Sequence, residues 1–276
     1  MLITKNFVML NVPKTGTTFS RTVIKKVYNN KYGAILNKIG YKLKILKREI
    51  IELKLPNIKM PTKSLDQHGV YSQIPTKYRN RPIVSVVRNP YSRFLSSYKF
   101  RSWANPTQLT VSKEIIKNKF PSFPNLNLDT YVDLSLEAEK TRLEWIKEGV
   151  ENIHDLGPQT IQFVQFFFKN PEEAILKINE EYITSGAYRK DMADIRFLQV
   201  ENLKDDLYNL LSECGFTKKE LAFVKEHKKM NVTKSKTKAT NKEWTEKALQ
   251  YVTYRERFLF LILKDFGIEY QKPNLD

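Results

Sequence analysis

The chain has 276 residues, of which 41% are hydrophobic and 28% charged, with a formal net charge of +17. This apolar fraction is too high for a disordered chain, and no apolar run reaches the roughly 20 residues of a membrane-spanning helix. The only cysteine, Cys214, excludes an internal disulfide, and the three histidines, His68, His154 and His227, lack the spacing of a metal site. The N-terminus lacks the features of a signal peptide. We therefore expect a globular, cytoplasmic protein without a metal.

The positive charge is concentrated in two stretches, Arg21 to Lys63 and Lys228 to Lys242. A strongly basic chain of this kind indicates an anionic partner. A phosphorylated small molecule, an anionic polymer such as a sulfated glycan, or nucleic acid would each fit. A lysine-rich surface without any such role explains the charge equally well, so the motifs must decide.

The first elements form a strand, a turn and a helix. Lys5–Val12 is a short apolar run ended by Pro13, which predicts a buried strand. The turn residues Pro13 to Thr18 follow, and then a helical stretch from Phe19 to Tyr28. Apolar residues from Ile39 to Leu53 recur at steps of three and four, which predicts an amphipathic helix packed on the core rather than on a membrane surface.

A second strand and helix follow the same plan. Pro82–Val87 predicts a strand that ends at Arg88. Asn89 is a good helix N-cap and Pro90 suits the first helical position, so a helix should begin there and run to about Trp103. Residues 104–127 are rich in Pro, Asn, Ser and Thr and predict a long loop.

The remaining pattern alternates strands with helices. We expect helices at Leu128–Lys147, Thr160–Phe168 and Pro171–Tyr182, a strand at Ile195–Val200, helices at Leu203–Cys214 and Thr217–Glu226, a basic loop at His227–Thr240, and one long helix at Lys242–Phe266. This alternation predicts a single α/β domain over residues 1–276, with a mainly parallel central sheet flanked by helices.

The turn after the first strand has the composition of an anion-binding loop. Backbone N–H groups at a glycine turn and at a helix N-terminus point toward one spot, where the helix dipole favours an anion. Gly16 permits close backbone approach, Thr17 and Thr18 add hydroxyl groups, and Lys14 adds a charge. The loop lacks the GxxxxGK[ST] pattern of a Walker A motif, and an ordinary turn is the alternative interpretation.

Arg88 and the helix after it form a second candidate anion site. A guanidinium at a strand end lies where α/β sheets place their ligands. Ser92 and Ser96 are one helical turn apart, so they lie on the same face of the predicted helix. Arg88 stands just before the start of that helix. Arg88 could instead form a structural ion pair. Two anion sites on one sheet suggest a ligand with two separated phosphate-like groups.

These residues resemble a known family. The segments VPKTGTT and VVRNPYSRFLSSY are similar to motifs of sulfotransferases that use 3'-phosphoadenosine 5'-phosphosulfate, most closely the carbohydrate-type branch called sulfotransferase family 2. Three later segments are similar too: His154–Gln159 (HDLGPQ), Val200–Leu203 with Asp206, and Met230–Lys234. The resemblance implies a P-loop nucleotide-binding fold, with nucleotide-binding elements at residues 5–30, 81–103 and 227–240 and an acceptor-shaping insert at about 104–159.

The resemblance also implies roles for single residues. The loop of Lys14, Thr15, Gly16, Thr17 and Thr18 would hold the 5'-phosphosulfate, and Lys14 would stabilise the charge that grows on the leaving phosphate. Arg88 and Ser96 would hold the 3'-phosphate. A late loop with Lys234 would close over the nucleotide. The product would be adenosine 3',5'-bisphosphate, and no metal would be needed.

His68 is the candidate base. In-line attack by a hydroxyl needs a base opposite the leaving group, and imidazole titrates near neutrality. His68 lies in KSLDQHGVYSQI, 20 residues before Arg88, where family 2 enzymes have a similar K-x-H segment. Here Lys63 stands five residues before His68, which departs from that pattern. A loop histidine bonded to the backbone, or a carboxylate base elsewhere, is the alternative.

The sequence therefore predicts transfer of a sulfuryl group to a hydroxyl, expected on a carbohydrate, with no nucleic acid as partner. A P-loop phosphotransferase is one alternative, although the missing GK[ST] argues against it. A charge-driven protein that binds nucleic acid or another polyanion is the other.

Overall fold

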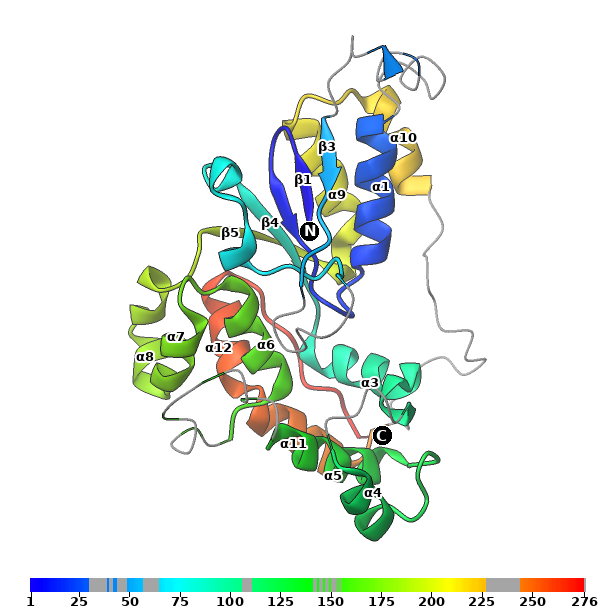
Figure 1. The fold of residues 1–276 in the computed structure, drawn as a ribbon, viewed down its shortest axis with the longest axis vertical. Coiled ribbons are helices and arrows are strands. Elements are labelled where there is room, and N and C mark those ends of the chain that lie inside the picture. Colours follow the sequence, from blue (N-terminus) through cyan, green and yellow to red (C-terminus); the bar gives the residue numbers. More distant parts are fainter. Residues whose placement is uncertain are drawn as a thin grey trace. The chain divides into compact units, whose positions relative to one another are not determined.

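The structure is a computed structural model that describes residues 1–29, 39, 42–43, 49–56, 65–105, 111–140, 143, 146, 149, 153, 155–226 and 244–275. The chain divides into two compact units. The first comprises Met1–Arg88 and Asp194–Val232, and the second comprises Asn89–Ala193 and Thr233–Asp276. Both are drawn in Figure 1.

The first unit is built on a five-stranded sheet with the order β3-β1-β2-β4-β5. Its strands are β1 (Leu2–Thr4), β2 (Val8–Leu10), β3 (Ile50–Glu52), β4 (Ile83–Val87) and β5 (Ile195–Gln199). β2 pairs parallel with β4, and β4 pairs parallel with β5. β1 pairs antiparallel with both β2 and β3. The strands predicted around β2, β4 and β5 are therefore confirmed, and they form the parallel half of the sheet.

The prediction of a mainly parallel sheet was wrong, because the sheet is mixed. β1 and β2 are joined by a tight turn, in which the Thr4 N–H donates to the Phe7 carbonyl at 2.9 Å. So short a connection allows only antiparallel pairing. The Thr4 hydroxyl closes the turn by donating to the same carbonyl at 2.9 Å.

The predicted amphipathic helix from Ile39 to Leu53 was wrong at its C-terminal end. Ile50–Glu52 is the edge strand β3, with Ile51 opposite Ile3 of β1. Three residues are too few to show a period of two, and a step of three or four among apolar residues therefore suggested a helix. Most of the remaining stretch lies outside the described residues.

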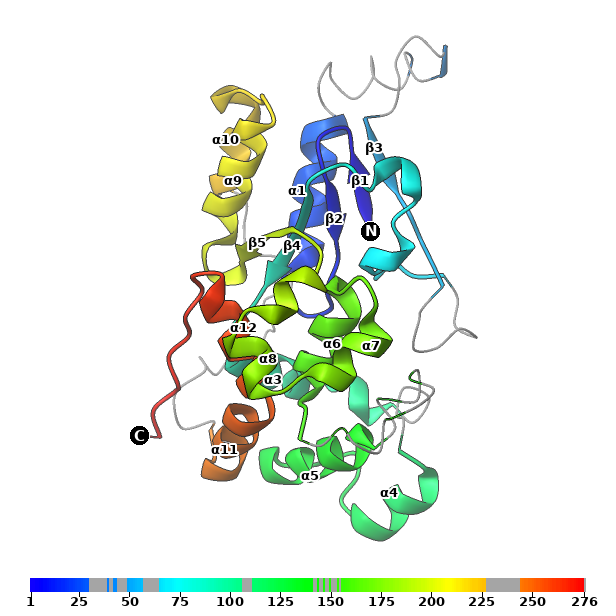
Figure 2. The same ribbon diagram turned by 90° about the vertical axis from the view of Figure 1, so that its left-hand side faces the viewer.

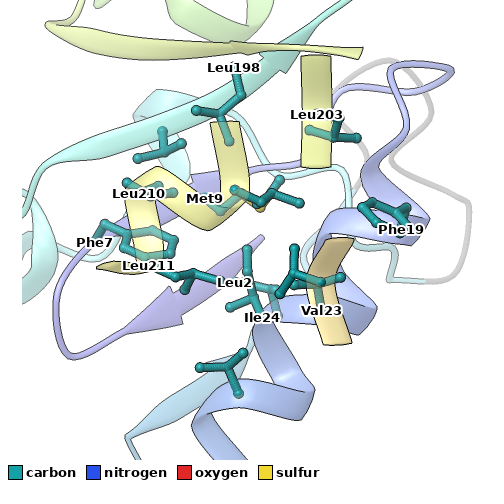
Figure 3. Close-up of a cluster of buried hydrophobic side chains, with 14 of the residues drawn as sticks. Leu2, Phe7, Met9, Phe19, Val23, Ile24, Leu198, Leu203, Leu210 and Leu211 are labelled. Carbon is teal, nitrogen blue, oxygen red and sulfur yellow. The ribbon is translucent and has the colours of Figure 1, made fainter. Parts of the chain in front are cut away.

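In the described part of the first unit, three helices contribute side chains to the core: α1 (Thr17–Asn29), α9 (Leu203–Glu213) and α10 (Lys218–Glu226). Buried side chains on α1 recur at helical spacing, as at Phe19, Val23 and Val27, so one stripe of the helix is apolar. These side chains belong to the same buried cluster as Met9 of β2 and Leu198 of β5. Figure 3 shows part of this cluster, with Phe19 and Val23 of α1 labelled. The core thus fixes the start of α1 against the parallel strands.

The described part of the second unit consists mainly of helices, as Figure 2 shows. They are α3 (Pro90–Phe100), α4 (Lys113–Lys119), α5 (Leu128–Glu139), α6 (Pro158–Phe167), α7 (Pro171–Lys177), α8 (Glu180–Thr184), α11 (Glu246–Arg255) and α12 (Arg257–Asp265). Their core is rich in aromatic rings: Tyr91, Phe94, Tyr98, Trp103, Tyr131, Trp244 and Tyr251. Such rings bury large apolar areas with defined mutual geometry.

Three predictions in the second unit need correction. The predicted loop at 104–127 contains α4, which begins where the Ser112 hydroxyl accepts from Ile115 N at 3.3 Å. The predicted helix Pro171–Tyr182 is two helices, because Asn179 caps a new one by accepting from Tyr182 N at 2.8 Å. The predicted long helix at Lys242–Phe266 is also two, α11 and α12, separated at Glu256.

The break at Glu256 follows from what its side chain binds. The buried carboxylate accepts from the backbone N–H groups of Gln159 at 3.0 Å and Thr160 at 2.7 Å, and from the Thr160 hydroxyl at 2.7 Å. It thereby satisfies donors at the N-terminus of α6. Burial raises the pKa of Glu256, while these hydrogen bonds act in the opposite direction. A contact with so distant a segment leaves no local signature in the sequence.

Among the helices that the structure describes, none combines the length and the apolar character needed to cross a lipid bilayer.

Candidate functional site

The candidate site lies in the first unit, where three neighbouring parallel strands end at one edge of the sheet. β2 leads into the loop of residues 11–16, β4 leads into Arg88, and β5 leads into Val200 and Glu201. Ligands of open α/β sheets bind at this edge, outside the carboxyl ends of the strands. The topology therefore places the Lys14–Thr18 loop and Arg88 at the same edge of the sheet.

The loop between β2 and α1 has an unusual backbone. Lys14 has φ of 66° and Gly16 has φ of 70°, both in the left-handed region. This conformation is strained for lysine, and such strain in a non-glycine residue is typical of functional loops. A Cβ on Gly16 would also lie 3.0 Å from Leu203 Cδ2, so the loop approaches the start of α9 closely.

The hydroxyl groups of this loop have divided roles. Those of Thr15 and Thr17, both buried, donate to the Val12 carbonyl at 2.9 and 3.4 Å and thereby fasten the loop to the end of β2. Thr18 is exposed. The Gly16 carbonyl accepts from Phe19 N at 3.0 Å and so begins α1, whose first turn carries no acidic residue. An anion at this helix N-terminus would meet no opposing charge from that turn.

Lys14 and Arg88 are neighbours. The Arg88 Nη1 donates to the Lys14 carbonyl at 3.3 Å. Burial, followed by repulsion from Arg88, lowers the pKa of Lys14 to about 8. Burial also lowers the pKa of Arg88, against an attraction to Glu201 that raises it. Two partly buried cations of like charge, held side by side at a strand edge, favour a multiply charged anion.

His68 is fastened to the same loop. Its ring Nδ1 lies 2.6 Å from the Asn11 carbonyl, and its backbone N–H donates to Asp66 Oδ1 at 2.7 Å. Asn11 is the first residue of the loop and stands three residues before Lys14, so the histidine contacts the loop at its start. A carbonyl oxygen only accepts hydrogen bonds, so Nδ1 carries the hydrogen and Nε2 holds the lone pair of the neutral ring. That arrangement suits a base that acts through Nε2.

The segment around His68 is held by contacts from distant residues. Leu55 and Asp66 form a two-way backbone bridge, with N···O distances of 2.7 and 2.9 Å. A Cβ on Gly69 would lie 2.6 Å from Leu55 Cδ1, so the backbone just after His68 packs against that side chain. The position of His68 is therefore set by tertiary contacts that the spacing of residues does not reveal.

Ser96 lies in the second unit, on α3, whereas Arg88 is the last residue of the first segment of the first unit. The predicted start of α3 is confirmed: the Asn89 side chain accepts from Tyr91 N at 2.9 Å, and Pro90 occupies the first turn. Within the second unit, Gln159 Nε2 donates to the Pro90 carbonyl at 2.9 Å. Gln159 of the HDLGPQ segment thus fixes the first turn of the helix that carries Ser96.

Several predicted features lie outside the described residues. They are Lys234 with the loop at 227–240, His154 and His227.

Within the described ranges, no three His, Cys, Asp or Glu side chains are grouped as they would be to hold a metal ion. Cys214 is half-buried at the end of α9, and burial raises the pKa of its thiol, as expected of a packed rather than a reactive cysteine.

Two residues at this edge were given no role from the sequence. Glu201 acts electrostatically on Arg88, whereas the sequence marked it only as part of the Val200–Leu203 segment that resembles the family. The Asn11 carbonyl forms a hydrogen bond with the His68 ring. The only signal in the sequence was that Asn11 is a polar residue inside the apolar run KNFVMLNV.

Comparison with known proteins identifies the family of the chain. No curated protein and no solved structure matches the chain. The model of the sulfotransferase family matches residues 2–266, a range that includes the loop between β2 and α1, His68, Arg88 and most of both units. Because the match covers nearly the whole chain, the protein belongs to the sulfotransferase family, in its family 2 branch, and sulfuryl transfer is its general activity.

Proposed function

We propose that this protein transfers a sulfuryl group from 3'-phosphoadenosine 5'-phosphosulfate to a hydroxyl group on a carbohydrate. The observation that carries the proposal is the contact between Lys14 and Arg88 at the ends of two adjacent parallel strands. His68 is fastened to the root of the same loop. Sulfotransferases generally use this nucleotide as donor.

The residues at this edge suit a nucleotide with separated anionic groups. The 5'-phosphosulfate would lie on the Lys14–Thr18 loop, where α1 presents its N-terminus without an acidic first turn. Arg88 would bind the 3'-phosphate together with Ser96, and Lys234 would add a cation from the late loop. A carbohydrate acceptor is supported by the family 2 motifs and by the net charge of +17, which suits an anionic glycan.

Each group at the edge has a task in such a reaction. When bound, the donor supplies the sulfuryl group: an oxygen–sulfur bond to the acceptor forms as the bond to the 5'-phosphate breaks. His68 Nε2 takes the proton of the acceptor hydroxyl, because Nδ1 already donates to Asn11. The Lys14 ammonium donates to the oxygen on which negative charge develops, in a partly buried setting that strengthens the interaction.

We also propose that both units act as one sulfotransferase domain, since the family match spans them both. The acceptor-shaping part would be residues 104–159 of the second unit. The Gln159 contact with Pro90 gives that part a direct role in fixing α3.

A thermal-shift comparison tests the donor class. Adenosine 3',5'-bisphosphate should raise the melting temperature by several degrees in EDTA, since a ligand that binds only the folded state stabilises it by mass action. ATP with magnesium and a short DNA duplex should give much smaller shifts. A dominant shift with ATP and magnesium would indicate a phosphotransferase, and a dominant, steeply salt-dependent shift with DNA would indicate a polyanion-binding protein.

The affinity for adenosine 3',5'-bisphosphate should fall as the pH rises through about 8. Lys14 is charged below its lowered pKa of about 8 and neutral above it, whereas the phosphates are dianionic throughout this range. Binding should therefore be nearly constant from pH 7 to 7.5 and then weaken by up to about tenfold per pH unit. Calorimetry from pH 7 to 9.5 measures this, and Lys14→Arg, which stays charged, should flatten the profile. A flat profile in the unaltered protein would contradict a role for Lys14 in binding.

A further inference from the structure

Asn11 is a completely buried polar residue at the start of the loop between β2 and α1, directly after β2. It contacts two consecutive residues of the segment that carries the proposed base. Its carbonyl accepts from His68 Nδ1 at 2.6 Å, and its side-chain Nδ2 donates to the Gln67 carbonyl at 3.3 Å. One residue thus holds both the ring of His68 and the backbone just before it.

The side-chain oxygen of Asn11 lowers the stability of the folded protein. Its Oδ1 is buried and has no hydrogen-bond partner among the residues that the structure describes. A buried acceptor without a partner destabilises a protein, and an apolar side chain of similar shape would avoid that cost. Stability alone therefore does not account for asparagine at this position, whereas the contact with the His68 segment does.

We propose that Asn11 is a positioning residue that keeps His68 in the tautomer with hydrogen on Nδ1 and the lone pair on Nε2. This inference rests on the proposed role of His68 as base. The tautomer of a histidine is set by the hydrogen bond that one of its nitrogens makes. Here that bond requires the ring to stay within reach of the Asn11 carbonyl, and the bond from Nδ2 to Gln67 holds the backbone that positions the ring.

Other hydrogen bonds of the segment should let the protein fold without the Asn11 amide, so that a change in the tautomer of His68 can be measured. His68 N–H donates to Asp66 Oδ1 at 2.7 Å, and the Met1 amino group donates to the Gln67 carbonyl at 2.6 Å. These bonds keep the segment folded when the Asn11 amide is removed, but neither of them ties the segment to Asn11. The protein should then fold normally, while the ring gains freedom to leave the carbonyl and to populate the tautomer with hydrogen on Nε2.

The variant Asn11→Leu tests the proposal without any knowledge of the acceptor. The tautomer of His68 is read from the ¹⁵N chemical shifts of the imidazole nitrogens at pH 9, where imidazole is ordinarily neutral. The signals are assigned by their loss in His68→Asn. We expect hydrogen on Nδ1 in nearly all molecules of the unaltered protein, and a fall of that fraction to about half or less in Asn11→Leu.

Ser85→Ala is the matched control. Ser85 is equally buried, on the adjacent strand β4, and its hydroxyl donates to the Leu10 carbonyl at 3.0 Å, one residue before Asn11. The substitution removes a hydrogen bond at the end of β2 without changing any contact of the His68 segment, so the tautomer of His68 should not change. If Asn11→Leu does not fold, Asn11→Ala removes the same amide and carries the same expectation.

Further readouts separate positioning from a structural role. Asn11→Leu should have a melting temperature equal to or above that of the unaltered protein, and an unchanged affinity for adenosine 3',5'-bisphosphate. Sulfuryl transfer should fall about tenfold, yet not fall further when Asn11→Leu is added to His68→Asn, because the effect passes through His68.

An unchanged tautomer in both Asn11→Leu and Asn11→Ala would overturn the proposal, as would an equal loss of transfer in the His68→Asn background. A different result would refute the proposed base instead. If His68→Asn transfers sulfate at the normal rate while the tautomer still follows Asn11, then Asn11 positions His68 but His68 is not the base.

Discussion

Lys14→Met is expected to weaken the binding of adenosine 3',5'-bisphosphate about 30-fold and, at pH 7, to raise the melting temperature. The loss of affinity follows from removing a cation that would bond to phosphate, since charge-assisted hydrogen bonds contribute about 1.5–3 kcal/mol. The gain in stability follows from the lowered pKa of Lys14, about 8, because burial and Arg88 disfavour the charged form in the folded protein. Methionine has a similar length and carries no charge.

The sign of the stability change can be checked against pH. Below about 8, Lys14 is charged in both folded and unfolded protein, so the full cost of its charge is present at pH 7. Between about 8 and 10.5 the folded protein loses this proton first, so the unaltered protein gains stability as the pH rises. The difference between Lys14→Met and the unaltered protein should therefore shrink over that range.

Lys77→Met is the matched control for this experiment. Lys77 is exposed and precedes β4, at the amino end of that strand, and its loss changes the net charge by the same amount. Neither affinity nor melting temperature should change appreciably. Calorimetry and thermal denaturation measure both variants, and an unchanged affinity in Lys14→Met would remove Lys14 from the proposed donor site.

His68→Asn is expected to reduce sulfuryl transfer by about 10²- to 10⁴-fold, the usual contribution of a general base. The asparagine Nδ2 can donate to the Asn11 carbonyl in place of the histidine Nδ1, but it cannot take a proton. The affinity for adenosine 3',5'-bisphosphate and the melting temperature should therefore stay close to those of the unaltered protein. The combination of lost transfer with retained binding is what identifies a base.

Transfer is measured from ³⁵S-labelled donor to the acceptor that the unaltered protein uses best among desulfated heparin, chondroitin and N-acetyllactosamine oligosaccharides. His68→Ala is the comparison variant, because it lacks both the base and the bond to Asn11 and should also lose stability. A parallel loss of transfer and nucleotide affinity in His68→Asn would mean that His68 helps to hold the donor rather than acting simply as a base.

The parts of the fold that the sequence predicted well are those governed by local rules. The strand at β4 and the helix that follows it could be located because Asn89 and Pro90 are strong signs of a helix start. The loop before α1 could be located because turn residues follow an apolar run directly. Both motifs end parallel strands, so their meeting at one edge followed from topology.

The parts that escaped prediction depend on contacts between distant residues. β1 and β3 have three residues each, too few for a periodic pattern, and their pairing makes the sheet mixed. Glu256 interrupts a helical pattern because its carboxylate binds the start of α6, nearly a hundred residues away in the sequence. The contact of His68 with Asn11 has the same origin, so spacing could nominate the histidine but could not place it.

The most direct test of the account is calorimetric titration with adenosine 3',5'-bisphosphate and with adenosine 5'-monophosphate, both in EDTA at pH 7. The two ligands differ only in the 3'-phosphate, which Arg88 would bind beside the Lys14 loop. We expect the bisphosphate to bind at least tenfold more tightly than the monophosphate. Equal affinities, or no binding of the bisphosphate, would contradict the assignment of this sheet edge as the site of the sulfate donor.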